Sequence, residues 1–432
     1  MSRERWCCGA LIAAFALGLA ACGGSGERPL RIGVIVDCQG AFRALRDVEL
    51  SGAQLPLMTR GAKRNGRESG AGVTAARVAG RPVELVRGCS ESGELAAVTQ
   101  VARLLVERMK VDVVVEGGVF SVDGIVLREV ARRYPDVPFV AAANGPREVT
   151  LLGSPASVYR VAADYGQGVA GLATYAYREL GWRQVAVASE DWVAGWGAET
   201  AFVREFCSLG GRVTRRVALA PGGAPNDPVR VPRDVDGVAV LASGTAMTPE
   251  YLRALARRLG APAQRLVVGP EITGDAELVR GAGSALRGAV GSAYAPPFAS
   301  SSDVRSYLRD YARVNPGASA SEPLSPLVVG YRNAVEAVLR AFEHAHGELS
   351  DDRRELRAAL GRLRTRLLGV PVRMDAHGQA VVSATLVRLG TPTAVQTVSG
   401  VDQSIGGLVP VDYVPGEGGQ VCRRAPLPRW DG

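Results

Sequence analysis

Short apolar runs alternate with longer amphipathic stretches along the first part of the chain. The apolar runs, rich in Val and Ile, lie at 31–36, 83–86, 111–115 and 139–142. Between them, apolar residues recur every three or four positions, for example at 94–109 and 122–133. Continuous apolar strands that alternate with helices are typical of a parallel sheet with helices on both faces. The pattern therefore predicts an α/β unit.

The same pattern then starts again. The predicted strands of the second unit lie at 184–188, 211–218, 237–241 and 265–268. Its predicted helices lie at 166–178, 196–209 and 249–259. Two α/β lobes of similar size in one chain place a cleft between them. With 432 residues, 47% of them hydrophobic, the chain is long enough for two cores.

Two helices and a hairpin are predicted after the second unit. The helices span 326–344 and 351–367, and the hairpin pairs 372–375 with 380–389 around a turn at His377. The last segment, 390–432, is rich in Gly and Pro and has few periodic runs. We expect it to be irregular.

The N-terminus has the pattern of an export signal. Arg3 and Arg5 precede an apolar stretch at 7–21, which is too short to cross a membrane. The end of this stretch, Leu19-Ala20-Ala21-Cys22, resembles the lipobox of bacterial lipoproteins, which implies cleavage after residue 21 and lipid on Cys22. Residues 1–21 are then a signal peptide and 22–28 a lipidated tether. The alternative is an ordinary secretory signal with a chance cysteine.

Four cysteines remain in the mature chain apart from Cys22: Cys38, Cys89, Cys207 and Cys422. An even number outside the cytoplasm predicts two disulfides. Cys38 and Cys89 each follow a predicted strand, so they meet at one sheet edge if those strands are neighbours. Cys207 would then pair with Cys422. The cysteines and histidines have no metal-binding spacing, and we expect no metal and no cofactor.

The formal charge of +8 comes almost entirely from scattered arginines. No basic run carries interleaved aromatic residues, so the sequence does not indicate a nucleic-acid partner.

Several motifs, in order, resemble the type I periplasmic-binding proteins, in the leucine/isoleucine/valine-binding branch. They include the opening strand at 31–36, Gly52-Ala53, the segment 181–187 that opens lobe 2, the turn Gly269-Pro270-Glu271, and the hairpin at 374–378. The resemblance covers roughly residues 29–389. It implies two doubly wound parallel-sheet lobes joined by three crossings, with lobe 1 at 29–158 and 292–345 and lobe 2 at 159–291 and 346–389.

The same resemblance implies a solute-binding subunit of an ABC importer. A small polar or zwitterionic ligand, such as an amino acid or amide, would close the lobes about the hinge, and permease subunits would bind the closed form. The protein would lie outside the cytoplasm, held at the membrane by its lipid. The alternative function is a ligand sensor that feeds a receptor or regulator. An enzyme is a third possibility, but the chain has neither GxSxG nor HExxH.

Candidate ligand-binding residues follow from the resemblance. In lobe 1, Ser121 and Asn144 stand at turns where family members bind a ligand carboxylate, although each could simply cap a helix or hold a turn. The neighbouring Asp123 and Ala141-Ala142-Ala143 depart from the family pattern and put an amino-acid ligand in doubt.

In lobe 2, the candidates are Trp192, Trp196, Met247 and Glu271. The tryptophans offer planar covers for a ligand, and Glu271 matches the carboxylate that meets a ligand ammonium. For each residue, core packing or a surface salt bridge is the alternative interpretation.

Gly166-Gln167-Gly168-Val169-Ala170-Gly171 satisfies the dinucleotide pattern GxGxxG. However, no buried strand feeds directly into it, so we do not expect a nucleotide site there.

Overall fold

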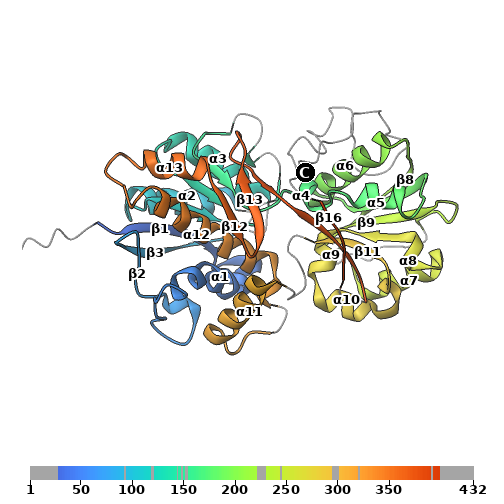
Figure 1. Cartoon of the computed structure of the whole chain (residues 1–432), viewed down its shortest axis with the longest axis horizontal. Coiled ribbons are helices and arrows are strands. Elements are labelled where there is room, and N and C mark those ends of the chain that lie inside the picture. The colour runs from blue at the N-terminus through green and yellow to red at the C-terminus, as the bar shows by residue number, and fades with distance from the viewer. Residues whose placement is uncertain are drawn as a thin grey trace, which may run out of the picture.

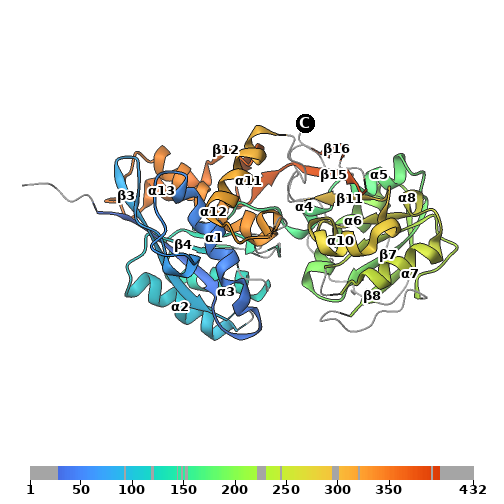
Figure 2. The same ribbon diagram turned by 90° about the horizontal axis from the view of Figure 1, so that it is seen from below.

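The structure is a computed structural model that describes residues 28–398, except for 92–93, 118–120, 144, 147–148, 151–153, 221–229, 244–245, 294–300, 320–321 and 391–392. The described chain forms two α/β lobes that lie side by side along the long axis of the molecule (Figure 1). The view from below shows the same separation, with elements crossing between the lobes (Figure 2). The predicted fold class is confirmed.

Lobe 1 is built on a sheet that has six strands within the described residues. Their order is β2 (Ala76–Val78), β3 (Arg81–Ser90), β1 (Leu30–Asp37), β4 (Val113–Glu116), β5 (Phe139–Ala141) and β6 (Val158–Arg160). All neighbours are parallel except β2 and β3. The helices of this lobe are α1 (Arg46–Met58), α2 (Leu95–Glu107), α3 (Ser121–Arg133), α11 (Ser302–Val314), α12 (Pro326–His344) and α13 (Arg354–Gly361), with 3₁₀ turns at Gly40–Leu45 (η1), Ser69–Ala71 (η2) and Glu322–Leu324 (η6).

The alternation of side chains along β1 explains why helices cover both faces of this sheet. Ile32 and Val34 belong to a core that includes residues of α1 and α12. Ile35 points to the opposite face and packs in a second core with residues of α2 and α3. Because successive side chains of a strand point to opposite faces, a strand that is apolar throughout must be covered twice.

Lobe 2 is built on a sheet with seven described strands. Their order is β16 (Thr393–Val398), β15 (Ala384–Arg388), β11 (Val290–Ala293), β10 (Leu266–Val268), β9 (Gly237–Leu241), β7 (Gln184–Glu190) and β8 (Arg212–Leu219). The strands from β8 to β11 are parallel, whereas β15 and β16 are antiparallel to their neighbours. The helices are α4 (Tyr165–Gly168), α5 (Leu172–Arg178), α6 (Val193–Ser208), α7 (Pro249–Leu259), α8 (Pro262–Arg265), α9 (Pro270–Gly274) and α10 (Ala276–Ala282), followed by a 3₁₀ turn at Gly283–Leu286 (η5).

Two glycines let α12 approach its neighbours in lobe 1. A Cβ at Gly52 of α1 would lie 2.5 Å from the backbone oxygen of Val328 in α12. A Cβ at Gly330 of α12 would lie 2.6 Å from the backbone oxygen of Ala142, just after β5. Both contacts are with backbone, so no side-chain rotation could relieve them.

The chain passes from one lobe to the other after β6, after β11 and after β14 (Ala380–Val382). α13 and the three-stranded antiparallel sheet of β12 (Arg364–Leu367), β13 (Val370–Met374) and β14 pack with the core of lobe 1. Leu356, Leu360 and Met374 are members of that core. The predicted assignment of 346–389 to lobe 2 is therefore wrong for the residues up to 382, because their apolar side chains are buried against α12 and the first sheet.

Three local predictions also need correction. Residues 364–367, predicted as the end of a helix, form β12. The predicted strand at 380–389 is divided at Ser383, so that β14 stays with lobe 1 and β15 enters the sheet of lobe 2. Residues 393–398, predicted to be irregular, form β16, because β15 offers them a partner edge. The rest of the Gly/Pro-rich segment, 399–432, lies outside the described residues, as do residues 1–27 with Cys22.

Candidate ligand-binding site

A cavity of about 1020 Å³ opens between the two lobes. Its walls come from the carboxyl edges of both sheets, from η1 and α12 of lobe 1, from α9 and α10 of lobe 2, and from the crossing segments. Ligand sites in doubly wound sheets lie at this edge, since the loops that follow the strands meet there. The volume exceeds what a single small solute fills, which fits lobes that are apart.

The wall from lobe 1 is mainly apolar. Phe42 and Leu45 of η1 lie on one side of it, and Ala142 follows β5. Val329 and Asn333 of α12 complete this wall, with Asn333 providing an amide among the apolar groups. The wall can therefore bury an apolar part of a ligand.

The wall from lobe 2 carries two carboxylates. Glu190 ends β7, and one of its oxygens accepts hydrogen bonds from the backbone N–H and the hydroxyl of Ser243, at 3.1 and 2.8 Å. Glu271 is in the first turn of α9, directly after Gly269 and Pro270, and is partly exposed in the cavity. Pro270 fixes the backbone at the start of α9, so Glu271 is held just beyond the carboxyl end of β10.

Tyr165, the first residue of α4, lies on the floor of the cavity. Burial, together with the carboxylates of Glu271 and Glu190, raises the pKa of Tyr165. Its hydroxyl therefore stays protonated at neutral pH and can donate or accept a hydrogen bond. The cavity thus has a negative field on the side of Glu190 and Glu271, and a phenol on its floor.

Two arginines also line the cavity. Arg388 of β15 donates to the backbone oxygen of Gly288 and to the hydroxyl of Tyr175, at 3.1 and 3.0 Å, so its guanidinium already has partners. Arg280 of α10 is exposed. A ligand carboxylate could pair with Arg280.

The predicted site residues fall into three groups. Trp192 and Glu271 line the cavity. Trp196 points its indole N–H at Asp191, 3.1 Å away, and Met247 is 2% exposed in the core of lobe 2, so neither is in the cavity wall. Ser121 begins α3, but its side chain is outside the described part of the chain, as is the whole of Asn144.

Sequence reasoning missed Tyr165, Phe42 and Ser243. Tyr165 follows Asp164, whose carboxylate accepts from the backbone N–H of Gln167 at 2.6 Å and caps α4. The spacing of Asp164 and Gln167 is a capping box, and that pattern could have shown where α4 begins. No local pattern indicates Phe42 or Ser243, because their place in the wall depends on which strands are neighbours.

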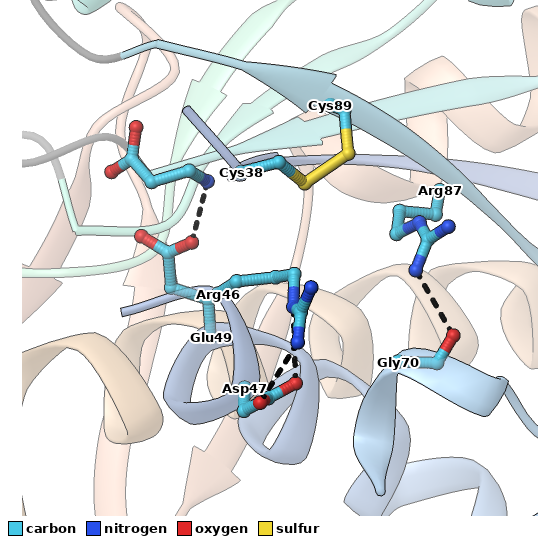
Figure 3. The surroundings of a disulfide bond; sticks show 8 residues. Cys38, Arg46, Asp47, Glu49, Gly70, Arg87 and Cys89 are labelled. Atoms are coloured by element: carbon cyan, nitrogen blue, oxygen red, sulfur yellow. Dashed lines mark hydrogen bonds and ion pairs between the residues drawn. A yellow bond between two sulfur atoms is a disulfide. The ribbon is translucent and has the colours of Figure 1, made fainter. Parts of the chain in front are cut away.

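One predicted disulfide is confirmed. Cys38 and Cys89 are bonded, with Cα atoms 5.2 Å apart, where β1 and β3 run side by side (Figure 3). Figure 3 also shows Glu49 beneath the bridge. Its carboxylate accepts a hydrogen bond from the backbone N–H of Asp37 at 2.8 Å. Cys38 precedes η1, so the bridge fixes the base of the turn that carries Phe42.

Cys207 of α6 is also disulfide-bonded. Its predicted partner, Cys422, lies outside the described residues.

Among the described residues, no group of three or more His, Cys, Asp or Glu side chains is arranged to hold a metal ion. None of the helices in the same residues has the length and apolar character needed to cross a bilayer.

A two-lobed fold with a cavity across its crossings defines a class of proteins that bind a solute between the lobes. The periplasmic binding protein family model matches residues 29–393, and the chain belongs to this family. The predicted family is thus confirmed, and membership implies a place outside the cytoplasm. Among curated proteins, no sequence matches significantly.

Solved structures of substrate-binding proteins share the fold at low sequence identity. An ABC transporter substrate-binding protein from Sphaerobacter thermophilus has 20% identity and a TM-score of 0.73, covering 86% of this chain and 98% of its own. A solute-binding protein from R. palustris, solved with 4-hydroxybenzoate, has 19% identity and a TM-score of 0.69, covering 88% and 100%. A leucine-binding protein from Thermotoga maritima has 20% identity and a TM-score of 0.61, covering 86% and 99%.

Proposed function

We propose that this protein is the lipid-anchored solute-binding subunit of an ABC importer and that it closes on a small zwitterionic molecule with an apolar part. The observation that carries the proposal is the cavity itself, which has an apolar wall from lobe 1 and a carboxylate-bearing wall from lobe 2. An ammonium group beside Glu271 and Glu190 would form charge-assisted contacts in a partly desolvated site. The apolar part would lie against Phe42 and Val329.

Lobe closure supplies the differential affinity that transport needs. A ligand that contacts both walls stabilises the closed form over the open form by the free energy of the contacts made only when the lobes are closed. The permease can then distinguish loaded from empty protein by shape. Trp192, at the cavity wall of lobe 2, would cover the ligand in that state.

Aromatic acids are the competing ligand class, since one solved relative holds 4-hydroxybenzoate. An acid of this kind has a carboxylate and no ammonium, so it would be repelled by Glu271 and would depend on Arg280. The two classes therefore predict opposite effects of single substitutions.

The test is a thermal-shift screen of the unlipidated mature protein with L-leucine, other amino acids, their amides, benzoate and 4-hydroxybenzoate. A zwitterionic compound should raise the Tm, and Glu271→Gln should abolish that rise while Arg280→Gln only reduces it. Glu277→Gln is the matched control, because Glu277 is exposed on α10 and is not in the cavity wall. A rise that survives Glu271→Gln but is lost in Arg280→Gln would replace the zwitterion with an acid.

The anchor has a separate test. Full-length protein expressed in a bacterial host should be in the membrane fraction, with a lipid mass on the N-terminal Cys22 peptide. Cys22→Ser should release it. Equal membrane association of both forms would contradict the lipid anchor.

A further inference from the structure

Tyr165 contacts segments of both lobes. Its backbone N–H donates to the carbonyl of Gly145 in lobe 1 at 2.9 Å, and a Cβ at Gly145 would lie 2.3 Å from the tyrosine ring. On its other side, a Cβ at Gly197 of α6 would lie 3.1 Å from the Cβ of Tyr165. The ring thus packs closely against Gly145, while its Cβ passes close to Gly197. Substituting either glycine would force the lobes or the ring to move.

A buried polar network lies behind Tyr165. The side-chain N–H groups of Gln379 donate to the backbone oxygen of Ala162 at 2.9 Å and to the side-chain oxygen of Gln167 at 3.0 Å. Its own side-chain oxygen accepts from Nε of Arg160 at 2.5 Å and from the hydroxyl of Thr150 at 3.2 Å. Gln379 is fully buried and does not line the cavity.

The same network holds both crossing segments together. The backbone N–H of Arg160 donates to the carbonyl of Gly378 at 2.8 Å, which joins the end of β6 to the segment before β14. Asp164 lies 3.8 Å from Arg160 and caps α4 through Gln167. Arg160 and Asp164 are fully buried, and Gln167 is 1% exposed. Because a buried polar group that loses its partner is costly, the network is expected to move as one body.

The two hydrophobic cores show where that body ends. On the first crossing, Gln167 belongs to the network and Val169 to the core of lobe 2, which leaves Gly168 between them. On the crossing after β14, Val382 belongs to the core of lobe 1 and Ala384 to the core of lobe 2, which leaves Ser383 between them.

We propose that Gly168 and Ser383 are pivots of lobe closure on the two crossings described here, after β6 and after β14, and that the network around Gln379 fixes Tyr165 to lobe 1. Tyr165 then moves as part of lobe 1 while Glu190 and Glu271 approach it from lobe 2. Hinge motions are absorbed by a few residues at the ends of elements, and on these two crossings Gly168 and Ser383 stand where one set of packed residues ends and the next begins. Gln379 is a positioning residue, since it acts on the site only through Tyr165 and the crossings.

The test measures the distance between the lobes without ligand. Spin labels are introduced as an unnatural amino acid at Arg108 in lobe 1 and Arg257 in lobe 2, both exposed, so that the native cysteines stay untouched. Gln379→Ala should broaden the distance distribution, because residues 160–167 lose their attachment to lobe 1. Gln264→Ala is the matched control; Gln264 is exposed on α8 and should leave the distribution unchanged.

Thr150→Val provides a milder variant should Gln379→Ala fail to fold. It removes one hydroxyl of the network and should broaden the distribution in the same direction to a smaller extent. A folded Gln379→Ala or Thr150→Val protein with the wild-type distribution would overturn the proposal.

A second measurement rests on the proposed binding function. Titration with L-leucine or 4-hydroxybenzoate, whichever binds the wild type, should show about tenfold weaker affinity for Gln379→Ala if the fraction of molecules with a correctly placed Tyr165 falls to about a tenth. Unchanged affinity would contradict the positioning role of Gln379. If neither compound binds the wild type, the proposed ligand class fails. The distances between the spin labels without ligand still test whether the network around Gln379 fixes Tyr165 to lobe 1.

Discussion

The Cys38–Cys89 bridge should provide a large part of the stability of lobe 1. The two cysteines are 51 positions apart in the chain. On the chain-entropy model, closing a loop of roughly 50 residues stabilises the folded state by about 4 kcal/mol at 25 °C. Cys89 is exposed and Cys38 only partly buried, so replacing both by serine adds little packing loss. The double variant Cys38→Ser/Cys89→Ser should therefore be less stable by about that amount.

The assay is guanidinium unfolding of the unlipidated mature protein, followed by two probes. Far-UV circular dichroism reports both lobes. Within the described residues the tryptophans are Trp182, Trp192 and Trp196, all in lobe 2, so their fluorescence reports mainly that lobe. The double variant should lower the midpoint seen by circular dichroism, and reductant should lower the wild-type midpoint in the same direction.

Two outcomes would refute this reasoning. The first is a circular dichroism midpoint that does not move in the double variant. The second is a loss of stability seen only by tryptophan fluorescence, because it would place the effect in the wrong lobe.

Two further predictions concern stability. Gly52→Ala should destabilise the protein by about 1–3 kcal/mol in urea unfolding, since its Cβ would meet the backbone of Val328. The control Gly317→Ala should be nearly neutral, because no atom lies within 4 Å of a Cβ placed there. Equal effects of the two substitutions would contradict the close approach of α1 and α12. Burial raises the pKa of Glu205 from 4.5 to about 7, so native lobe 2 holds a proton that the unfolded chain releases. The free energy of unfolding should therefore fall by up to about 3 kcal/mol as pH rises from 4.5 to 7, and Glu205→Gln should remove that dependence. If the unfolding free energies of variant and wild type change with pH in parallel, Glu205 is not its cause.

Local sequence pattern was sufficient for most of the elements. The apolar run at 31–36 forms β1 with both faces covered, and strand β9 has the predicted bounds. These predictions succeeded because burial on both faces requires a continuous apolar strand, and that requirement is visible in a few consecutive residues. The predicted helix at 351–367 failed at its end, where Arg364–Leu367 pairs with β13.

The candidate site was only partly visible in the sequence. Glu271 and Trp192 were named from the family resemblance, and both line the cavity. Trp196, four residues from Trp192, hydrogen-bonds to Asp191 instead. One helical turn separates a cavity residue from a residue with another role, and such a resemblance cannot resolve positions so close.

The sequence by itself determined the two α/β lobes, the family and the cysteines that could meet at a sheet edge, because alternation, spacing and residue type are local properties. Only the tertiary structure decided which lobe received α13 and the strands up to Val382, that β16 exists, and that Gln379 joins Arg160 to Gln167. The link between Gln379 and Arg160 joins segments 219 positions apart, and even β16 forms only because β15 offers it a free edge. Such contacts form only when a buried surface or an unsatisfied polar group finds its partner in three dimensions.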